Sequence, residues 1–281
     1  MQSLASLDEL GTAYDALLCD VWGVLHDGKR VFAPAAAALV RARERGQIVV
    51  LLTNTPKPRD PIPDQLDRLG VPRAAWDVVV TSGDAIRREL AARAPGPMHR
   101  IGPEHDRAVW DGLGLELADV DTARFVCVSG LRDLAETPAD YADELRRMRD
   151  RDLEMLCANP DVRVRFGKDL IWCAGALARD YRALGGTVVM AGKPHAPIYD
   201  LALGEIVRRR GRAVPRSRIL CIGDGLETDV LGAQDNGFDC LFVASGMNGD
   251  LVADGRPEPA RIAAAFAAHG VAARHGIAQL Q

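Results

Sequence analysis

The sequence predicts an α/β protein with a doubly wound parallel sheet as its core and a second α/β domain inserted into that core. Short apolar runs that end in polar turns and are followed by helical patterns occur three times before residue 92, a succession typical of parallel strands joined by helices. The pattern changes at the Ala-Pro-Gly-Pro turn of residues 94–97 and returns near residue 187. A length of 281 residues has room for a large core and a smaller inserted domain.

The amino-terminal part of the core holds three predicted strands, each a short apolar run. The strands are 16–19, 48–52 and 76–80, and the helices that follow them are 34–45, 63–69 and a segment that ends at residue 92. Gly46 and Gly70 follow the first two helices, at the position where glycine is favoured as a helix cap. Successive strand–helix units of this kind predict a sheet with helices on both faces.

The middle of the chain, residues 86–188, is predicted to be the inserted domain, and residues 1–85 and 189–281 the core. Within the insert we expect strands at 124–128, 153–158 and 170–173 and helices at 105–112, 139–149 and 176–184. The core resumes with strands at 187–190, 219–222 and 240–243, helices at 197–210 and 229–236, and a helix after Pro259. The strand at 187–190 is therefore expected in the core sheet.

Composition and charge exclude several classes of protein. The formal net charge of −4 argues against a surface dedicated to nucleic acid. No apolar run approaches the ~20 residues needed to cross a bilayer, and the first residues lack the apolar stretch of a signal peptide. The six cysteines stand singly, without a CxxC pair, which favours buried thiols in a reducing compartment over a zinc site or a disulfide framework. We therefore expect a cytoplasmic protein without nucleic-acid or membrane partners.

Polar residues stand directly after several predicted strands. Asp20, Thr53 and Lys193 each follow an apolar run, Asp224 follows a later one, and Asp229 begins the next helix. Each of them alone is more commonly a turn residue, a helix N-cap or a solvated side chain. However, the carboxyl ends of parallel strands share one edge, where open α/β sheets bind ligands. The five side chains are therefore predicted to converge at that edge.

Such a group of side chains suits phosphoryl transfer. Crowded carboxylates repel one another and favour a hard divalent cation with oxygen ligands, such as Mg²⁺. Lys193 supplies a positive charge for a carboxylate or phosphate, and the Thr53 hydroxyl with the backbone N–H groups near Asn54 can hold phosphoryl oxygens. Asp20 is then placed to attack phosphorus and form an aspartyl-phosphate that water cleaves.

These residues and their order resemble the haloacid dehalogenase (HAD) superfamily, and most closely its class IIA, NagD-like branch. The four superfamily motifs match at Asp20 in DVWGVLHDG, at Thr53-Asn54, at Lys193 in GKP, and at Asp224 and Asp229 in GDGLETD. Branch features match in TSGDA at 81–85, CANPD at 157–161 and GALARDYRALGG at 175–186. The resemblance covers nearly the whole chain and implies a Rossmann-like core with a large α/β cap inserted after the third core strand.

The resemblance also implies a Mg²⁺-dependent phosphatase for a small phosphorylated metabolite, such as a sugar phosphate or a nucleotide monophosphate, and it is compatible with a homodimer. The implied catalytic residues are Asp20, Thr53 and Lys193. The implied substrate-binding residues are Asn54, Gly83, Asn159 and Asp161, and the implied metal ligands are Asp20, Asp224, Asp229 and the backbone carbonyl of Trp22.

One position departs from the superfamily pattern. Phosphatases of this superfamily usually carry a second Asp two residues after the nucleophile, as general acid and then base, and here that position is Trp22. An indole N–H cannot shuttle a proton near neutral pH, and losing such a group typically costs roughly 10²–10⁴-fold in rate. Either the substrate has a good leaving group, or another acid such as His26 or Asp27 serves, or the protein is a weak catalyst.

Two other functions stay open. A catalytically impaired protein that binds a phosphorylated metabolite would keep the fold, the metal and the cap, and Trp22 is the feature that favours it. Dehalogenation and phosphonate cleavage are disfavoured by the pair Asp224 and Asp229, although Lys168 in the cap keeps phosphonate cleavage open. His195, which follows the GKP segment, is either a substrate contact or the start of a helix.

Overall fold

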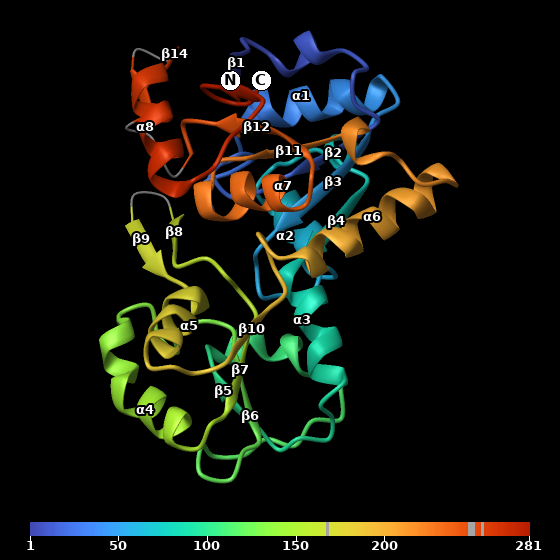
Figure 1. The fold of residues 1–281 in the computed structure, drawn as a ribbon. Coiled ribbons are helices and arrows are strands. Elements are labelled where there is room, and N and C mark those ends of the chain that lie inside the picture. The colour runs from blue at the N-terminus through green and yellow to red at the C-terminus, as the bar shows by residue number, and fades with distance from the viewer. Residues whose placement is uncertain (167–168, 247–250, 254–255) are drawn as a thin grey trace.

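The computed structural model describes residues 1–166, 169–246, 251–253 and 256–281 of the chain. Its strands form two parallel sheets, one of seven strands and one of four, which lie in separate parts of the molecule (Figure 1). This confirms the prediction of an α/β fold with a doubly wound parallel core and a second α/β part. Among the described residues, no helix is both long enough and apolar enough to cross a membrane.

The seven-stranded core sheet has the strand order β1-β15-β12-β11-β2-β3-β4, and all its neighbours pair in parallel. Its strands are β1 Gln2–Ser3, β2 Ala16–Cys19, β3 Ile48–Thr53, β4 Val78–Thr81, β11 Ile219–Gly223, β12 Asp239–Val243 and β15 His275–Ile277. The central strands β2, β3 and β11 are buried along their whole length and apolar except for Thr53 at the end of β3, because helices cover both faces of the sheet. β3 lies on one side of β2 and β11 lies on the other, so the order in which strands are added to the sheet reverses at β2. In a parallel sheet, such a reversal places a ligand crevice at the carboxyl ends of these strands.

Two hydrophobic cores lie on the two faces of this sheet. The helices are α1 Ala33–Glu44, α2 Ile62–Arg68, α3 Ser82–Ala91, α6 Ala196–Arg210, α7 Leu231–Asp235 and α8 Pro259–His269. Successive strand residues point to opposite faces, so Leu17 packs with Leu39 of α1, whereas Leu18 packs with Tyr199 of α6. Figure 1 accordingly shows α1 on one side of the sheet and α6 and α7 on the other.

The second part is built on the four-stranded sheet, with the order β10-β7-β6-β5. Its elements are β5 Met98–Ile101, β6 Phe125–Val128, α4 Ala142–Asp150, β7 Glu154–Cys157, α5 Ala174–Ala183 and β10 Val188–Met190, together with the antiparallel hairpin β8 Arg163–Phe166 and β9 Asp169–Trp172. Short helical turns are η1 Leu7–Leu10, η2 Arg73–Ala75, η3 Glu104–Val109, η4 Pro138–Tyr141, η5 Arg216–Arg218 and η6 Leu226–Val230, and a small hairpin pairs β13 Val252–Ala253 with β14 Arg256–Pro257. The hairpin β8–β9 projects from this part towards the core (Figure 1).

The structure corrects the prediction for the strand at 187–190. Residues 188–190 form β10, which pairs in parallel with β7 at the edge of the four-stranded sheet, with Val188 opposite Met155. The prediction failed because a short apolar run does not reveal which sheet it joins. The division into a core of residues 1–85 and 189–281 and a cap of residues 86–188 remains a prediction, whose second boundary falls within this strand.

Other elements also differ from the sequence pattern. The predicted helix at 105–112 is only the short turn η3, and the predicted helix at 229–236 is the π-helical turn η6 followed by α7. The strands β1, β5, β8 and β15 were not predicted, because they are two to four residues long or carry polar residues.

Candidate active site

The predicted site residues meet at the carboxyl edge of the core sheet. Asp20 directly follows β2, and its N–H donates to the carbonyl of Ile222 in β11 at 2.8 Å. Thr53 is the last residue of β3, and Asp224 follows β11. Lys193 reaches the same place from the second sheet, three residues after the end of β10. The predicted convergence is therefore observed, although the lysine arrives from a different sheet than expected.

Lys193 joins two of the carboxylates. Its Nζ donates to Oδ1 of Asp20 at 2.6 Å and to Oδ1 of Asp229 at 2.7 Å, and all three side chains are buried. Burial disfavours the charge on the lysine, but the carboxylates of Asp20 and Asp229 outweigh this and raise the pKa of Lys193. Lys193 is thus held as a permanent cation between two acids.

Burial and neighbouring charges act on the pKa of Asp20 in opposite directions. Burial raises the pKa of Asp20 well above its usual value, Lys193 opposes the shift, and the charges of Asp229 and Asp224 add to it. A second cation beside these three acids would therefore favour the ionised form of Asp20.

Three carboxylates are grouped closely enough to hold that cation. Asp20, Asp224 and Asp229 can each offer one oxygen, and these oxygens lie within 4.8 Å of one another in a buried position. Glycines make room around them: a Cβ at Gly23 or Gly246 would overlap the carboxylate of Asp224. An all-oxygen set of this kind fits Mg²⁺ or Ca²⁺, so the residues present fit the predicted metal.

Asn54 braces the lysine and connects the two parts of the molecule. Its Oδ1 accepts the backbone N–H of Lys193 at 2.8 Å, and its Nδ2 donates to the carbonyl of Lys193 at 3.1 Å and to Oδ1 of Asp161 at 2.9 Å. Burial raises the pKa of Asp161. Asn159 in turn accepts the N–H of Asp161 at 3.0 Å. Asn54, Asn159 and Asp161 all face the cavity described below, and their contacts with a substrate remain predictions.

Gly83 occupies a different place from the one predicted. It lies in the first turn of α3, and its N–H donates to the carbonyl of Thr55 at 3.1 Å. A Cβ there would overlap the backbone of Pro56, and Gly83 does not line the cavity. The glycine is needed for close packing beneath the loop that follows β3, so it supports that loop instead of facing the substrate.

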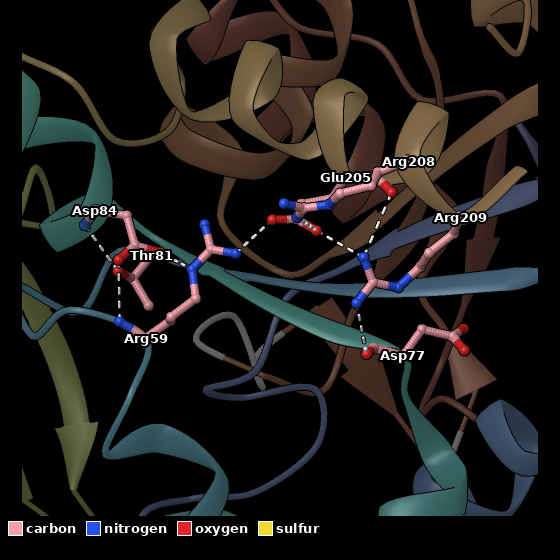
Figure 2. A network of polar contacts seen from close by, with 7 residues as sticks. All are labelled: Arg59, Asp77, Thr81, Asp84, Glu205, Arg208 and Arg209. Carbon is pink, nitrogen blue, oxygen red and sulfur yellow. Dashed lines mark hydrogen bonds and ion pairs between the residues drawn. The ribbon is translucent and has the colours of Figure 1, made fainter. Parts of the chain in front are cut away.

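That loop is anchored by a polar network that Figure 2 shows. The backbone N–H and Nε of Arg59 donate to the carboxylate of Asp84 at 3.0 and 2.7 Å, and its Nη1 donates to Oε1 of Glu205 at 2.5 Å. Glu205 is buried on α6 and also pairs with Arg208 and Arg209. The loop that carries Asn54 is thus fixed to both α3 and α6.

The residues near Trp22 do not supply the missing proton donor. His26 is buried outside the cavity lining, its Nδ1 accepts the N–H of Gly28 at 3.0 Å, and burial lowers its pKa to about 4. Asp27 faces the cavity, but its Oδ1 accepts the N–H groups of Lys29 and Arg30 at 2.9 and 2.7 Å. Although burial opposes the effect, these hydrogen bonds lower the pKa of Asp27. Neither residue is a good general acid near neutral pH.

A cavity of about 1730 Å³ lies over the site, between the core and the second part. Asp20, Thr53, Lys193 and His195 are among the residues that line it. Besides the predicted Asn159 and Asp161, the second part contributes lining residues that the sequence did not single out. They include Val164, Ile171, Trp172, Arg179 and Arg182, from the hairpin β8–β9 and from α5. The alternation of polar and apolar residues in Arg163–Phe166 could have signalled this strand. Lys168 lies outside the described residues.

The chain is similar to several known proteins. A family model described as haloacid dehalogenase-like hydrolase matches residues 17–116, and one described as HAD-hydrolase-like matches residues 190–269. A haloacid dehalogenase-like hydrolase structure from Brucella suis 1330 is 45% identical over 99% of this chain and 100% of that chain, with a TM-score of 0.89. Chronophin of Rattus norvegicus is 25% identical over 88% of this chain and 82% of its own length. A glycerol phosphate phosphatase from Mycobacterium tuberculosis, solved with magnesium, is 26% identical over 84% of this chain and 69% of that chain, with a TM-score of 0.61.

Proposed function

The chain belongs to the haloacid dehalogenase-like hydrolases, and from this membership we propose that it is a Mg²⁺-dependent phosphohydrolase that works through an aspartyl-phosphate on Asp20. It is a phosphatase of this family, and its substrates are small phosphorylated molecules. The observation that carries the proposal is the pairing of Lys193 with both Asp20 and Asp229, beside Asp224. A sugar phosphate or a nucleotide monophosphate is the proposed kind of substrate.

Each side chain has a role that its position supports. Lys193 holds Oδ1 of Asp20, which leaves the other carboxylate oxygen for attack on phosphorus. The Thr53 hydroxyl and the N–H groups after β3 would receive phosphoryl oxygens, as would the Lys193 ammonium. Asp20, Asp224, Asp229 and the Trp22 carbonyl would hold Mg²⁺, which supplies positive charge to offset the phosphoryl oxygens.

The proposed reaction consists of two successive displacements at phosphorus. A carboxylate oxygen of Asp20 bonds to phosphorus, and the bond from phosphorus to the ester oxygen breaks with its electron pair on the leaving group. A water oxygen then bonds to the same phosphorus, the bond to Asp20 breaks, and inorganic phosphate leaves with the water's protons. Lys193 keeps Asp20 in the same orientation for both steps because its second hydrogen bond, to Asp229, fixes its ammonium group.

The test is hydrolysis of p-nitrophenyl phosphate by the wild type and Asp20→Asn, with and without Mg²⁺. We expect activity to require both Asp20 and the metal. Asp200→Asn is the matched control, because Asp200 is exposed on α6 and does not line the cavity. Turnover that survives Asp20→Asn would exclude an aspartyl-phosphate.

The alternatives receive no further support. A catalytically impaired binding protein was suggested by Trp22, and no other feature of the described residues favours it. Phosphonate cleavage depended on Lys168, which lies outside those residues. Cytoplasmic location and a homodimer remain predictions.

A further inference from the structure

Two arginines of the second part lie against one tryptophan ring beside the catalytic cavity. Arg163 of β8 lies opposite Trp172 of β9 in the hairpin, and its guanidinium carbon is 3.5 Å from the centroid of the Trp172 ring. The guanidinium carbon of Arg179 on α5 is 6.0 Å from the same centroid. An arginine stacked on an aromatic ring keeps the N–H groups at the edge of its guanidinium plane free to bind an anion. The ring therefore holds two cations close to each other.

The charged side chains that this side of the second part presents to the cavity are all basic. Among the described residues of β8, β9 and α5, four form an arginine wall that lines the cavity: Arg163, Arg165, Arg179 and Arg182. The acids that line the cavity belong to the core, to η3 and to the loops after β6 and β7. Like charges gathered on one surface repel one another and attract an anion from solution. The arginine wall is therefore suited to bind an anionic group.

Carboxylates of the chain offer the arginine wall little competition. Arg163, Arg165 and Arg182 have no carboxylate oxygen within 4.0 Å in the part of the chain that the structure describes. Arg179 pairs with its neighbour Asp180 at 2.8 Å, and both side chains of this pair reach solvent, where such contacts contribute little. Three guanidinium groups of the wall can therefore pair with a ligand without breaking an ion pair.

The arginine wall and the catalytic residues line the same cavity. Arg182 lies close enough to His195 for its positive charge to add to the effect of burial, and both lower the pKa of His195. His195 comes two residues after Lys193, and both line the cavity together with Asp20. The cavity volume of about 1730 Å³ exceeds the roughly 300–1,000 Å³ of common ligand pockets. A substrate that extends from Asp20 to the arginine wall therefore has room.

We infer that the substrates are sugar phosphates that carry a second anionic group, a carboxylate or a second phosphate, and that Arg163 and Arg179 bind this group. The inference rests on the proposed function: one phosphate reacts at Asp20, and the second anion stays unchanged against the arginine wall. Arginine suits both anions because its planar fork donates two parallel hydrogen bonds to carboxylate or phosphate oxygens. Arg165 and Arg182 add positive charge around the bound anion.

The experiment measures phosphate release by the Mg²⁺-loaded wild type from two matched pairs of substrates. 6-Phosphogluconate and sorbitol 6-phosphate differ only in a terminal carboxylate, and fructose 1,6-bisphosphate differs from fructose 6-phosphate by a second phosphate. We expect kcat/KM to favour the doubly anionic member of at least one pair by roughly 10–10²-fold, the effect of hydrogen bonds to a charged group. A preference in the first pair identifies a carboxylate as the second anion, and a preference in the second pair identifies a phosphate.

Substitutions in the arginine wall should reduce this preference selectively. Arg163→Met and Arg179→Met should each raise KM for the preferred substrate about tenfold, while kcat/KM for p-nitrophenyl phosphate, which has no second anion, changes less than about twofold. Arg163→Lys should recover only part of the affinity, because lysine keeps the charge but not the planar fork. Arg124→Met is the matched control, because Arg124 is an exposed arginine of the second part that does not line the cavity.

A second arm tests the ring that holds the two arginines. Trp172→Leu keeps every charge but removes the ring, so the preference should fall, whereas Trp172→Phe keeps an aromatic face and should retain most of it. Added salt should weaken the preference of the wild type more than that of Arg163→Met, because the wall is exposed to solvent. A preference that neither Trp172→Leu nor salt alters would overturn the assignment of the second anion to this wall.

The results separate this inference from the proposed function. A wild type that prefers neither doubly anionic substrate overturns the inference, while Asp20-dependent hydrolysis of p-nitrophenyl phosphate would still uphold the proposed function. Equal losses for p-nitrophenyl phosphate and the preferred substrate in Arg163→Met and Arg179→Met would indicate a structural role and also overturn the inference. Turnover that survives Asp20→Asn would refute the proposed function itself. Because the wild-type preference needs no substitution, a variant that fails to fold leaves the test intact.

Discussion

Lys193 lies between two carboxylates that would otherwise repel each other, and its ammonium is almost wholly enclosed. A buried ion pair of this kind is strongly destabilised when one partner is removed, because the remaining charge is left unpaired in the interior. The same cation also faces the place where phosphoryl oxygens are proposed to bind. A single side chain therefore serves both the stability of the site and its chemistry.

Lys193→Met is expected to separate these two contributions. Without Mg²⁺, the variant should unfold with a free energy lower by about 3–5 kcal/mol, because two buried acids lose their partner. With Mg²⁺, kcat should still be lower by about 10²–10³-fold, since a preorganised charge is missing. Urea unfolding and steady-state kinetics measure the two effects. Activity within a few-fold of the wild type would contradict the role given to Lys193.

At the scale of elements, hydrogen bonds between charged side chains join a helix to the strand and the loop that lie beside it. Glu144 of α4 accepts hydrogen bonds from His99 of β5 at 2.8 Å and from Arg132, in the loop after β6, at 2.6 and 2.9 Å. Although burial opposes it, these bonds lower the pKa of Glu144 to about 2. The helix is thereby tied to strand β5 and to the loop that follows β6.

Acid should loosen this attachment. Because the folded-state pKa of Glu144 is below its unfolded value of 4.5, its stabilisation is complete above that value and is lost as the pH falls towards 2. We expect a loss of about 1–2 kcal/mol after allowance for solvent screening. Urea unfolding at pH 6 and pH 3 measures it. Glu144→Gln should lose less stability over the same interval, and an equal loss would show that other carboxylates are responsible.

The loop after β3 depends on the network around Arg59 (Figure 2). Arg59→Met removes its ties to Asp84 and Glu205, while Glu205 keeps Arg208 and Arg209 as partners. We expect kcat/KM for p-nitrophenyl phosphate to fall by about tenfold to 10²-fold, because small displacements of positioning groups are costly. Arg209→Met is the control, since it removes a Glu205 partner but no contact of the loop. Equal losses in both variants would indicate a general effect on folding.

The sequence indicated the elements whose signal is local. The central strands β2, β3, β4, β11 and β12 are apolar runs because both faces of the sheet are covered; the exceptions are Asp239 at the start of β12 and the threonines that end β3 and β4. Their apolar pattern alone identified them. The pairing of β10 with β7 joins residues about thirty positions apart, and no local pattern specifies it. For the same reason the contact between Trp22 and Phe166 could not be predicted from the sequence. In contrast, the position of Asp20, Thr53 and Asp224 at one edge of the core sheet could be predicted, because each of them stands at the end of a strand.

At the scale of the whole molecule, the core and the second part meet around one cavity. Asn54 contacts Asp161 across it, and Trp22 contacts Phe166. The acids proposed to hold the metal lie on the core side, after β2 and β11. Metal binding should therefore stabilise the core without needing the second part's residues.

Thermal unfolding tests this division. Mg²⁺ at about 100 times its dissociation constant should stabilise the wild type by about 2.7 kcal/mol, and a chelator should reverse the effect. Asp224→Asn should abolish most of the Mg²⁺-dependent rise in Tm. Asp161→Asn should keep it, because Asp161 is not among the three grouped acids. Loss of the rise in Asp161→Asn would place the metal site elsewhere.

The membership of β10 in the four-stranded sheet also dictates where the chain can be recombined. An exchange of caps between relatives with a junction before Val188 would strip that sheet of its edge strand and leave β7 unpaired on one side. A junction at Ala191, which is fully buried, keeps the donor's sheet complete. Lys193 then comes from the recipient and keeps its backbone hydrogen bonds to the recipient's own Asn54. Chimaeras built with the later junction should inherit the donor's substrate preference together with the recipient's catalytic lysine.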